Sequence, residues 1–589
     1  MNSPARGAAL GAANKSRRRL GLAALLAGLV LLAGCSGVPR SSRPEVVQTI
    51  PGNASAAPSE AGPAAGDEPR AIVQGFLNAA AESSDAKHSS ARQYLTTEAG
   101  SKWLDSSVTV VADFQVQFAS SADTTSTVAV NVQAVGHLDN HGIYTPVTKG
   151  VGEEENKKLD FELIKANGAW RINQLPAGVI IRADVFAQTY SPRLLYFFDP
   201  TLTTLIPDVR YTALEGEARA QWLLAALLAG PRPELIQSVQ SEVPAQVDGR
   251  PAAITLDDPI EIELPGTSQL DDQSQERLAY QLANTFGQIA FSSSLRLTDS
   301  GKVVDIPNIG SVFSAESFPA VGTDAPAPGA QSYYLRNGGL ISGATDRPVA
   351  GPVGSGAYGL TSVAVRRADT GGLLIAGLSP SGLLIGSSQS LSKVALPPGT
   401  PGRPEWQPRT SNVWLGVGNS IYRVGPDRKP KEFTLPTPVG GLPSGQIESF
   451  RFSPDGIRLA VIVRSPNRVG TLWIGSMTRI GANVGLDNFA QITPSGMSVD
   501  DVSWKDSTTM LMIASMARDA AQVWTVQSDG YNRQTLPSNG LPLGLLGIAV
   551  APGQPAVVSS ADPAAVSIQQ AGGGWVSLGA RAGAPTYAP

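Results

Sequence analysis

The chain has 589 residues and a formal net charge of −4 at pH 7; 42% of its residues are hydrophobic and 16% are charged. A chain of this composition folds into globular domains and does not stay disordered, and its length is enough for about three to four of them. Lysine and arginine form no dense run beyond Arg19, which argues against nucleic acid as a partner.

The first segment, residues 1–34, has the layout of a secretory signal peptide. Lys15 and Arg17–Arg19 precede the apolar run Leu20–Ala33, and small residues follow it. The run is shorter than the ~20 residues that a helix needs to cross a bilayer. We therefore expect it to direct export and then to be removed. Ser16-Arg17-Arg18 leaves both the general and the twin-arginine export routes open.

Cys35 is the single cysteine of the chain and directly follows this apolar run. The residues Leu32-Ala33-Gly34-Cys35 resemble the bacterial lipobox, in which the signal is cut before the cysteine. The resemblance implies lipid attachment at Cys35, as an N-palmitoyl cysteine and S-diacylglycerol cysteine that anchors the mature protein in the cell membrane. Two or three acyl chains hold a protein firmly, because each buried methylene contributes about 0.8 kcal/mol. The alternative is an ordinary apolar cysteine inside the signal.

Residues 35–69 are rich in proline, serine, alanine and glycine, and few large apolar side chains interrupt them. Such a segment cannot bury enough apolar surface to offset the entropy of ordering it, so we predict a lipidated flexible linker. A random coil of this length spans about 30 Å, which is enough to hold the folded domains clear of the lipid headgroups.

The first folded domain is predicted over residues 70–182 and is of α+β type. It starts with a helix, because apolar residues recur at helical spacing at Ile72, Val73, Phe76, Leu77 and Ala80. The segments VTVVADFQVQF and STVAVNVQAV alternate as strands do, and Asn167-Gly168 is typical of a tight hairpin turn. A helix followed by a curled sheet resembles the cone of nuclear transport factor 2. Such a cone can hold a pocket with an acid at its base, although no acid is singled out here.

The second domain, residues 184–314, is also predicted to be α+β. A strand in PRLLYFFDP precedes a helix over Leu214–Ala229 and another near Asp272–Gly287, and a hairpin around Asp299-Ser300-Gly301 ends the domain. The expected buried faces are Ala218, Trp222, Ala225 and Ala229 in the first helix, and Leu278, Leu282 and Phe286 in the second. LLYFFDPTLTTLIPDVR, LLAALLAGP and LRLTDSGKVVDI resemble the GerMN domain, a module of exported and sporulation-associated bacterial proteins with no known chemistry of its own.

The third domain, residues 330–589, is predicted to be an all-β propeller. A strand, a turn and a second strand recur at positions 41, 46, 52 and 46 residues apart, namely Val365, Trp406, Phe452, Trp504 and Val550. These intervals fit blades of about 40 to 50 residues and leave five, six or seven blades open. FSPDGIRLA and VWTVQSDGYNRQTLP resemble repeats of TolB-like propellers, with a tight turn at Pro454-Asp455-Gly456. We expect the recurring tryptophans to pack between blades, with sugar stacking as the alternative.

The sequence contains none of the catalytic or metal-binding motifs that we sought. Its three histidines are His88, His137 and His141, and we expect the last two on a solvated hairpin tip and not on a metal. No G-x-S-x-G elbow and no phosphate-binding loop accompanies them. We therefore predict no catalytic residue, no metal, no cofactor and no enzyme activity. An enzyme with an unusual site would need a confined acid in the cone of the first domain.

The order of these parts resembles the LpqB family of actinobacterial lipoproteins, as does the phrase GCSGVPRSSRPEVVQTI around the lipidation site. The resemblance implies a membrane-anchored accessory of a two-component system, which modulates an MtrB-type histidine kinase by contacting its extracytoplasmic domain. It carries over no catalytic residue, and Cys35 alone transfers by position. The alternative is a lipoprotein that binds cell-wall glycan or a small ligand in the cone or in the propeller channel.

Overall fold

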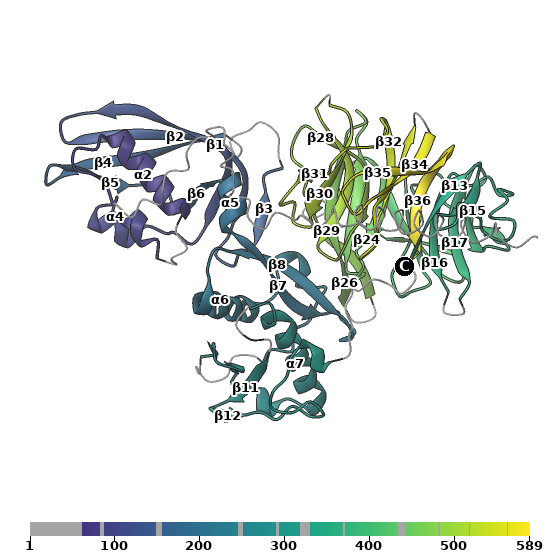
Figure 1. Ribbon diagram of the computed structural model, residues 1–589, viewed down its shortest axis with the longest axis horizontal. Helices are drawn as coiled ribbons and strands as arrows, with labels where there is room; N and C mark the ends of the chain where they lie inside the picture. Colours follow the sequence, from purple (N-terminus) through teal and green to yellow (C-terminus); the bar gives the residue numbers. More distant parts are fainter. Residues whose placement is uncertain are drawn as a thin grey trace, which may run out of the picture. The chain divides into compact units, whose positions relative to one another are not determined.

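The computed structural model describes residues 62–588 of the chain, and these form three domains (Figure 1). Short gaps interrupt the description at 83–86, 149–155, 245–250, 290–291, 293, 319–329, 369–370, 434–441, 481–482, 518 and 562–563. The predicted signal peptide, Cys35 and most of the predicted linker lie outside the described residues.

The N-terminal domain is a mixed sheet with helices packed against it. Its described strands follow the order β5-β4-β2-β1-β6, and β3 pairs with β2; β1 and β6 run parallel, the other pairs antiparallel. The strands are β1 (Val108–Ser121), β2 (Thr125–Leu138), β3 (Tyr144–Pro146), β4 (Asn156–Ala166), β5 (Ala169–Gln174) and β6 (Val179–Arg182). The helices are α2 (Pro69–Glu82), α3 (Ser89–Arg92), α4 (Thr97–Lys102) and α5 (Ala183–Thr189). Figure 1 shows α2 lying across the sheet.

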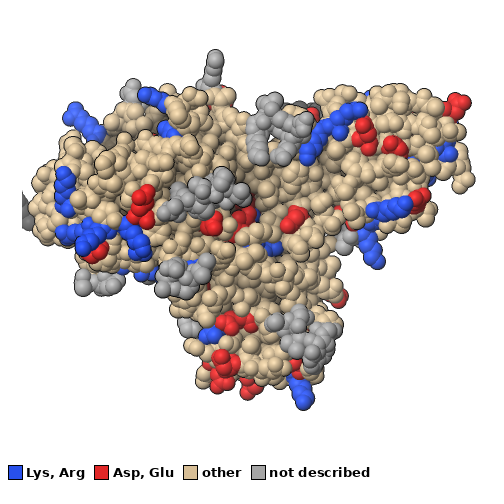
Figure 2. Space-filling model, turned by 180° about the vertical axis from the view of Figure 1, so that it is seen from behind, with Lys and Arg blue, Asp and Glu red and all other residues tan. Residues whose placement is uncertain are grey.

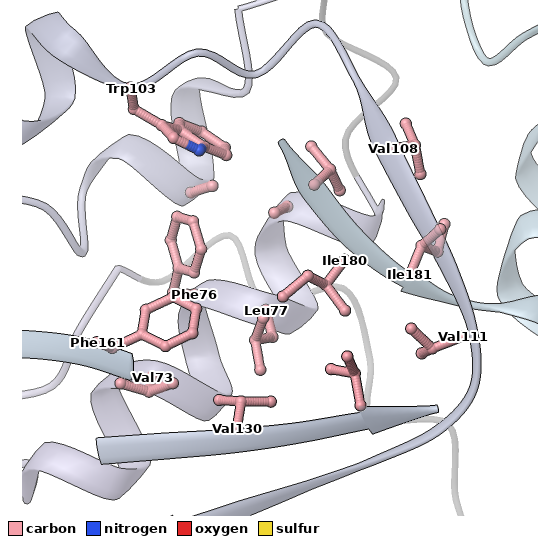
Figure 3. Close-up of a cluster of buried hydrophobic side chains, with 14 of the residues drawn as sticks. Val73, Phe76, Leu77, Trp103, Val108, Val111, Val130, Phe161, Ile180 and Ile181 are labelled. Carbon is pink, nitrogen blue, oxygen red and sulfur yellow. The ribbon is translucent and has the colours of Figure 1, made fainter. Parts of the chain in front are cut away.

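The core of this domain forms between α2 and the sheet. All the apolar residues that predicted this helix are buried, which confirms it. Phe76 and Leu77 point toward the strands, and the ring of Phe76 lies 6.0 Å from that of Phe161 in β4 (Figure 3). Full burial of one such side chain stabilises the fold by roughly 1.5–3 kcal/mol. The hairpin is confirmed as well, since Asn167 and Gly168 have φ angles of 51° and 82° between β4 and β5.

The second domain consists of a hairpin, two main helices and a small sheet of order β12-β11-β10-β9. Its elements are β7 (Ser191–Phe198), β8 (Leu205–Thr212), α6 (Gly216–Ala229), β9 (Ala253–Thr255), β10 (Ile260–Glu263), α7 (Asp272–Phe286), β11 (Leu295–Asp299) and β12 (Lys302–Val303). Helix α7 joins β10 to β11, which run parallel. The side chains Leu278, Leu282 and Phe286 of α7 are fully buried, as predicted.

The buried face of α6 differs from our expectation. The residues expected inside are Ala218, Ala225 and Ala229, which are exposed, and Trp222, which is half-buried. The residues that are buried are Ala220, Leu223, Leu224, Ala226 and Leu227. This helix is apolar nearly all round, so its periodicity does not select a face. The prediction was wrong because leucine buries more apolar area than alanine, and the leucines decide which face packs inward.

The C-terminal domain is a β-propeller whose described strands form six four-stranded sheets. The first blade holds β13 (Gln331–Arg336), β14 (Gly339–Ser342), β15 (Arg347–Pro348) and β36 (Ala582–Ala588); the second holds β16 (Ser362–Arg367), β17 (Leu373–Ser379), β18 (Gly382–Ser387) and β19 (Leu391–Lys393). The third holds β20 (Glu405–Trp406), β21 (Val413–Val417), β22 (Ser420–Val424) and β23 (Pro430–Phe433); the fourth holds β24 (Gln446–Phe452), β25 (Arg458–Arg464), β26 (Gly470–Ile480) and β27 (Asn483–Gln491). The fifth holds β28 (Met497–Trp504), β29 (Thr509–Met516), β30 (Gln522–Gln527) and β31 (Gln534–Thr535); the sixth holds β32 (Leu545–Ala549), β33 (Val557–Ala561), β34 (Ala564–Gln569) and β35 (Trp575–Ala580).

The ring closes because its last strand, β36, pairs with its first, β13. Trp414 of β21 packs between neighbouring blades, as predicted: it is fully buried and stacks on Phe450 of β24, with ring centroids 6.0 Å apart. The predicted tight turn is present too. Gly456 has a φ angle of 76°, and Oδ1 of Asp455 accepts the N–H of Ile457 at 2.9 Å.

Candidate functional site

The predicted lipid-attachment residue, Cys35, lies outside the described residues, so its lipidation stays a prediction. In the part of the chain that the structure describes, no helix combines the length and the apolar character needed to span a bilayer. The structure brings polar and aromatic side chains together elsewhere, at the centre of the propeller.

The innermost strands of the blades surround a central cavity of about 540 Å³. Neighbouring inner strands contact one another around the ring, so residues far apart in the sequence meet there. The positions that are equivalent in the sequence repeat all line this cavity, and these are Val365, Trp406, Phe452, Trp504 and Val550. Tyr587 of β36 also lines the cavity, and it belongs to the first blade, which contains strands from both ends of the domain.

Arg403, which precedes β20, reaches across the channel of the propeller. Its Nη1 lies 2.8 Å from Oδ2 of Asp501 in β28, and its Nη2 donates to the carbonyl oxygen of Pro585 in β36. These residues belong to the third, fifth and first blades, which alternate around the ring. A guanidinium group that spans three alternate blades must lie near the axis.

Arg451 of β24 extends this charged layer. Its Nη1 lies 3.1 Å from Oε2 of Glu405, and its Nη2 lies 3.7 Å from Oδ1 of Asp501. The backbone N–H of Ile548 fixes Asp501 further, at 2.9 Å. The side chains of Arg451 and Asp501 are each 6% exposed, so these charges are held almost entirely by protein groups. We call the four residues Arg403, Glu405, Arg451 and Asp501 the charged floor.

Burial shifts the protonation equilibria of two members of the charged floor. Burial raises the pKa of Glu405, although Arg451 and Arg403 oppose this effect. Burial, followed by the positive charge of Arg451, lowers the pKa of Arg403 to about 10. Arg403 therefore keeps its charge at neutral pH, and two guanidinium groups lie close together in a site with little water. A further negative charge in the cavity would favour both of them.

Aromatic side chains line the same cavity as the charged floor. The indole N–H of Trp406 donates to the carbonyl of Ala364 at 3.2 Å, and that of Trp504 donates to the carbonyl of Arg451 at 3.2 Å. Both rings are thus held in place by the backbone with their polar atoms already bonded. What they offer to the cavity is apolar ring surface.

A second, smaller cavity of about 210 Å³ lies where the three domains meet. Its charged and phenolic lining residues are Tyr144, Arg232, Glu234, Arg458 and Asp529. Arg458 of the propeller forms an ion pair with Asp455 at 3.1 Å and donates to the carbonyl of Pro207 in the second domain. The hydroxyl of Ser476 donates to the carbonyl of Glu234 at 2.8 Å. These hydrogen bonds cross the boundary between the propeller and the second domain. The residues around this cavity therefore help to hold the domains together.

The charged floor is a set of residues that we did not identify from the sequence. One signal was available, since Glu405 and Arg451 each directly precede a repeat position, Trp406 and Phe452. Asp501 carries a weaker signal because it lies at an irregularity in the pairing of β28 with β29. Only the closed ring brings these residues together.

The structure separates the three histidines. His88 is buried, with its ring 5.7 Å from that of Trp103. His141 is exposed in the predicted turn, but His137 lies in β2 itself, with Nδ1 3.4 Å from the hydroxyl of Thr109. The hairpin tip that we expected to carry both therefore carries only His141. Among the described residues, no group of three or more histidine, cysteine, aspartate or glutamate side chains is placed to hold a metal ion.

The cone of the N-terminal domain is packed with apolar side chains. Helix α2 fills the space against the sheet with the core described above. The carboxylates of the described strands β1 and β4 are Asp113, Asp160 and Glu162, and all of them are exposed. The described sheet therefore does not supply the confined acid that an active site in the cone would need.

Charged side chains are spread thinly over the face of the molecule in Figure 2. Basic and acidic residues stand there in small groups of both signs on a mainly uncharged surface. Neither sign dominates this face, in keeping with the charged fraction of 16%.

The described domains define a multidomain protein in which two small α+β domains precede a six-bladed propeller. Family models match in the same order: the N-terminal domain of lipoprotein LpqB over residues 62–187, the Germane domain of sporulation and spore germination over 194–305, and the LpqB beta-propeller domain over 338–588. The chain is 30% identical to lipoprotein LpqB of Rhodococcus jostii (strain RHA1) over 88% of each protein. It is 27% identical to that of Mycolicibacterium smegmatis over 95% of this chain and 97% of the relative. The chain belongs to the LpqB family of lipoproteins, as predicted.

Proposed function

We propose that the protein is a lipid-anchored, extracytoplasmic lipoprotein without enzyme activity, which modulates a membrane sensor kinase of the MtrB type by binding its exported domain. The observation that carries this proposal is membership of the LpqB family over 88% of the chain, together with the lipobox-like residues that end at Cys35. The kinase as partner comes from the family resemblance.

The proposed anchor makes weak binding sufficient. A lipid at Cys35 would confine the protein to the thin layer above the membrane in which the exported domain of a kinase also lies. Tethering two partners in this way raises their effective concentration to the order of millimolar. Contacts that would be too weak in free solution would then be occupied most of the time.

The folded body suits a modulator because its domains are bonded to one another. Arg409 of the propeller donates to the hydroxyl of Thr204 at 2.8 Å, and the N–H of Tyr211 donates to the carbonyl of Gly142 at 2.9 Å. A body joined in this way presents its surfaces in a fixed arrangement. A kinase changes its activity when such a partner binds one of its conformations better than the other.

The test is reconstitution of the lipidated full chain with an MtrB-type kinase in vesicles, with kinase autophosphorylation as the readout. We expect the lipidated protein to change autophosphorylation at a lower concentration than Cys35→Ala, because only the former is concentrated at the membrane. A pull-down with the exported domain of the kinase checks direct binding. The proposal fails if neither form binds that domain and neither changes autophosphorylation.

A further inference from the structure

We propose that the central cavity of the propeller binds a small organic anion that carries a ring, such as a carboxylated sugar. This site would be separate from the proposed contact with a kinase, and its existence does not depend on that contact. The inference rests on three features of the cavity: its excess of basic groups, the fixed positions of two of them, and its apolar ring surfaces.

Positive charge exceeds negative charge around the cavity. The described lining contains a single glutamate, Glu405, and five arginines, namely Arg366, Arg367, Arg403, Arg409 and Arg451. Asp501 adds one more carboxylate beside them. Arg366 and Arg409 already donate to Thr410 and Thr204. The arginines of interest are therefore those whose donors still lack an acceptor.

Two of the buried donors make no hydrogen bond. Among the described residues, Nη2 of Arg451 and Nε of Arg367 are shielded from solvent and have no hydrogen-bond partner, although Nη2 of Arg451 lies 3.7 Å from Oδ1 of Asp501. Arg451 as a whole is only 5% exposed. A buried donor without an acceptor destabilises the protein. Both arginines line the cavity, so a shift of either side chain toward it would let an anionic oxygen there supply the missing acceptor. Charge-assisted hydrogen bonds of this kind are about twice as strong as neutral ones.

The charged floor holds Arg451 and Arg403 in fixed positions at the cavity. Glu405 fixes Nη1 of Arg451 at 3.1 Å, and Asp501 fixes Nη1 of Arg403 at 2.8 Å. The arginine side chains therefore lose little further conformational entropy when an anion binds. Such preorganisation favours affinity, because the cost of ordering has been met during folding.

The remainder of the lining fits a ring. Val365, Phe452 and Val550 add aliphatic and aromatic surface to that of Trp406 and Trp504, whose N–H groups are already bonded. A mainly apolar wall with a few convergent charged groups is typical of small-molecule sites, and 540 Å³ falls within their usual range of roughly 300–1,000 Å³. The apolar face of a sugar ring or of an aromatic ring would lie against the tryptophans, with its acid on the arginines.

The test is direct binding to the full chain, which is measured by quenching of tryptophan fluorescence and by calorimetry. N-acetylmuramic acid carries a carboxylate, N-acetylglucosamine 6-phosphate carries a phosphate, and N-acetylglucosamine is the neutral control with the same ring. We expect one or both anions to bind, and the neutral sugar to bind roughly tenfold to a hundredfold more weakly. Preference between the two anions tells whether the acid is a carboxylate or a phosphate.

Variants then locate the site. Arg451→Gln and Arg367→Gln should each weaken binding of the anion by about tenfold or more. Arg347→Gln is the matched control, because Arg347 is exposed on the outer strand β15 of the same propeller. Nε of Arg367 makes no hydrogen bond to the described residues, and Arg367 is only half-buried, so its variant keeps the test decisive if Arg451→Gln fails to fold.

Three results would overturn the proposal. The first is that no probe binds at concentrations up to about 10 mM. The second is equal binding of neutral and anionic sugars. The third is equal loss of binding in Arg367→Gln and Arg347→Gln, or no loss in either. None of these results bears on binding of a kinase, so the two proposals fail separately.

Discussion

Arg210 and Asp208 form a two-pronged ion pair in the interior: Nη2 lies 2.8 Å from Oδ2, and Nε lies 3.1 Å from Oδ1. Their side chains are 1% and 0% exposed. The pair also spans a boundary between domains. Nη1 of Arg210 donates to the carbonyl of His141 in the N-terminal domain at 3.1 Å, and the N–H of Arg232 donates to Asp208 at 2.8 Å.

Replacing Asp208 with alanine should destabilise the protein strongly. The change leaves the Arg210 guanidinium buried without its carboxylate, which typically costs about 3–5 kcal/mol. The midpoint of chemical unfolding, followed by circular dichroism, measures the effect. Asp160→Ala is the control, because it removes a carboxylate from the solvent-exposed pair with Lys158 and should shift the midpoint little.

A double variant separates the loss of an ion pair from the loss of packing. In Asp208→Ala/Arg210→Met the uncompensated charge is gone, so we expect part of the lost stability to return. If the double variant is less stable than Asp208→Ala, the buried charge is not the cause of the destabilisation.

Gly142 allows the N-terminal domain to approach the second domain closely. A methyl group on Gly142 would lie 2.6 Å from Trp222 and 2.7 Å from the carbonyl oxygen of Tyr211. Gly142→Ala should therefore push these groups apart, at a cost of about 1–3 kcal/mol for overpacking beyond the cost of its φ angle of 73°. Hydrogen exchange of the Tyr211 amide, which donates to the carbonyl of Gly142, should become faster.

Gly168→Ala is the matched control for this prediction. Gly168 has a φ angle of 82°, but a methyl group there would meet no atom within 4 Å. The control thus carries the conformational cost without the steric one. Equal losses of stability in the two variants would show that the close approach to Trp222 contributes nothing.

Some elements were predictable because a single face of each is apolar. In α7, Leu278, Leu282 and Phe286 stand one helical turn apart between polar residues, so spacing alone identifies the buried face. Helix α6 has no such contrast, and its packing is decided by which side chains bury more area. The propeller was readable for a different reason, because a strand, a turn and a second strand recur at intervals of 41, 46, 52 and 46 residues. The order of the domains along the chain predicted the family, which no single element identifies.

Other features depend on contacts between distant parts of the chain. The number of blades was not readable, because β36 completes the first blade only after the ring has closed. Asp208 and Arg210 alternate with apolar residues as in a half-exposed strand, yet every residue of β8 is buried, because contacts from other domains cover it. Arg403 and Asp501 likewise look like ordinary surface residues until the ring brings them together.

Asp529 should make stability depend on pH. Burial raises the pKa of this carboxyl, although the nearby Arg232 lowers it. The groups around it are Tyr211, Tyr531, Arg232 and Arg533, and the N–H of Tyr531 donates to its Oδ1 at 3.0 Å. Because the pKa is higher in the folded state, that state binds the proton more tightly. The stability that this proton contributes is present at low pH and is lost as pH rises through the folded pKa.

Asp529→Asn removes this dependence, because the amide stays neutral at every pH. The pKa of this carboxyl in the unfolded state is about 4. Above that pH, the free energy of unfolding of the variant minus that of the natural protein should rise by at most about 1.4 kcal/mol per pH unit, until the folded carboxyl has ionised. Unfolding midpoints at several pH values measure the difference. Asp519→Asn, at an exposed position of the same blade, should run parallel to the natural protein. A fall in the stability of Asp529→Asn relative to that of the natural protein as pH rises over this range would contradict the assignment.

Cys35→Ala should abolish lipid attachment and release the protein from membranes without changing its folded domains. The thiol is the expected site of the diacylglycerol, and we expect the predicted linker to separate it from the folded domains. Mass spectrometry of the N-terminal peptide detects the lipid, and fractionation followed by thermal unfolding of the released protein checks anchoring and fold. Ser36→Ala keeps the cysteine and should remain lipidated and in the membrane fraction. Lipid mass on the Cys35→Ala protein would place the anchor at another residue.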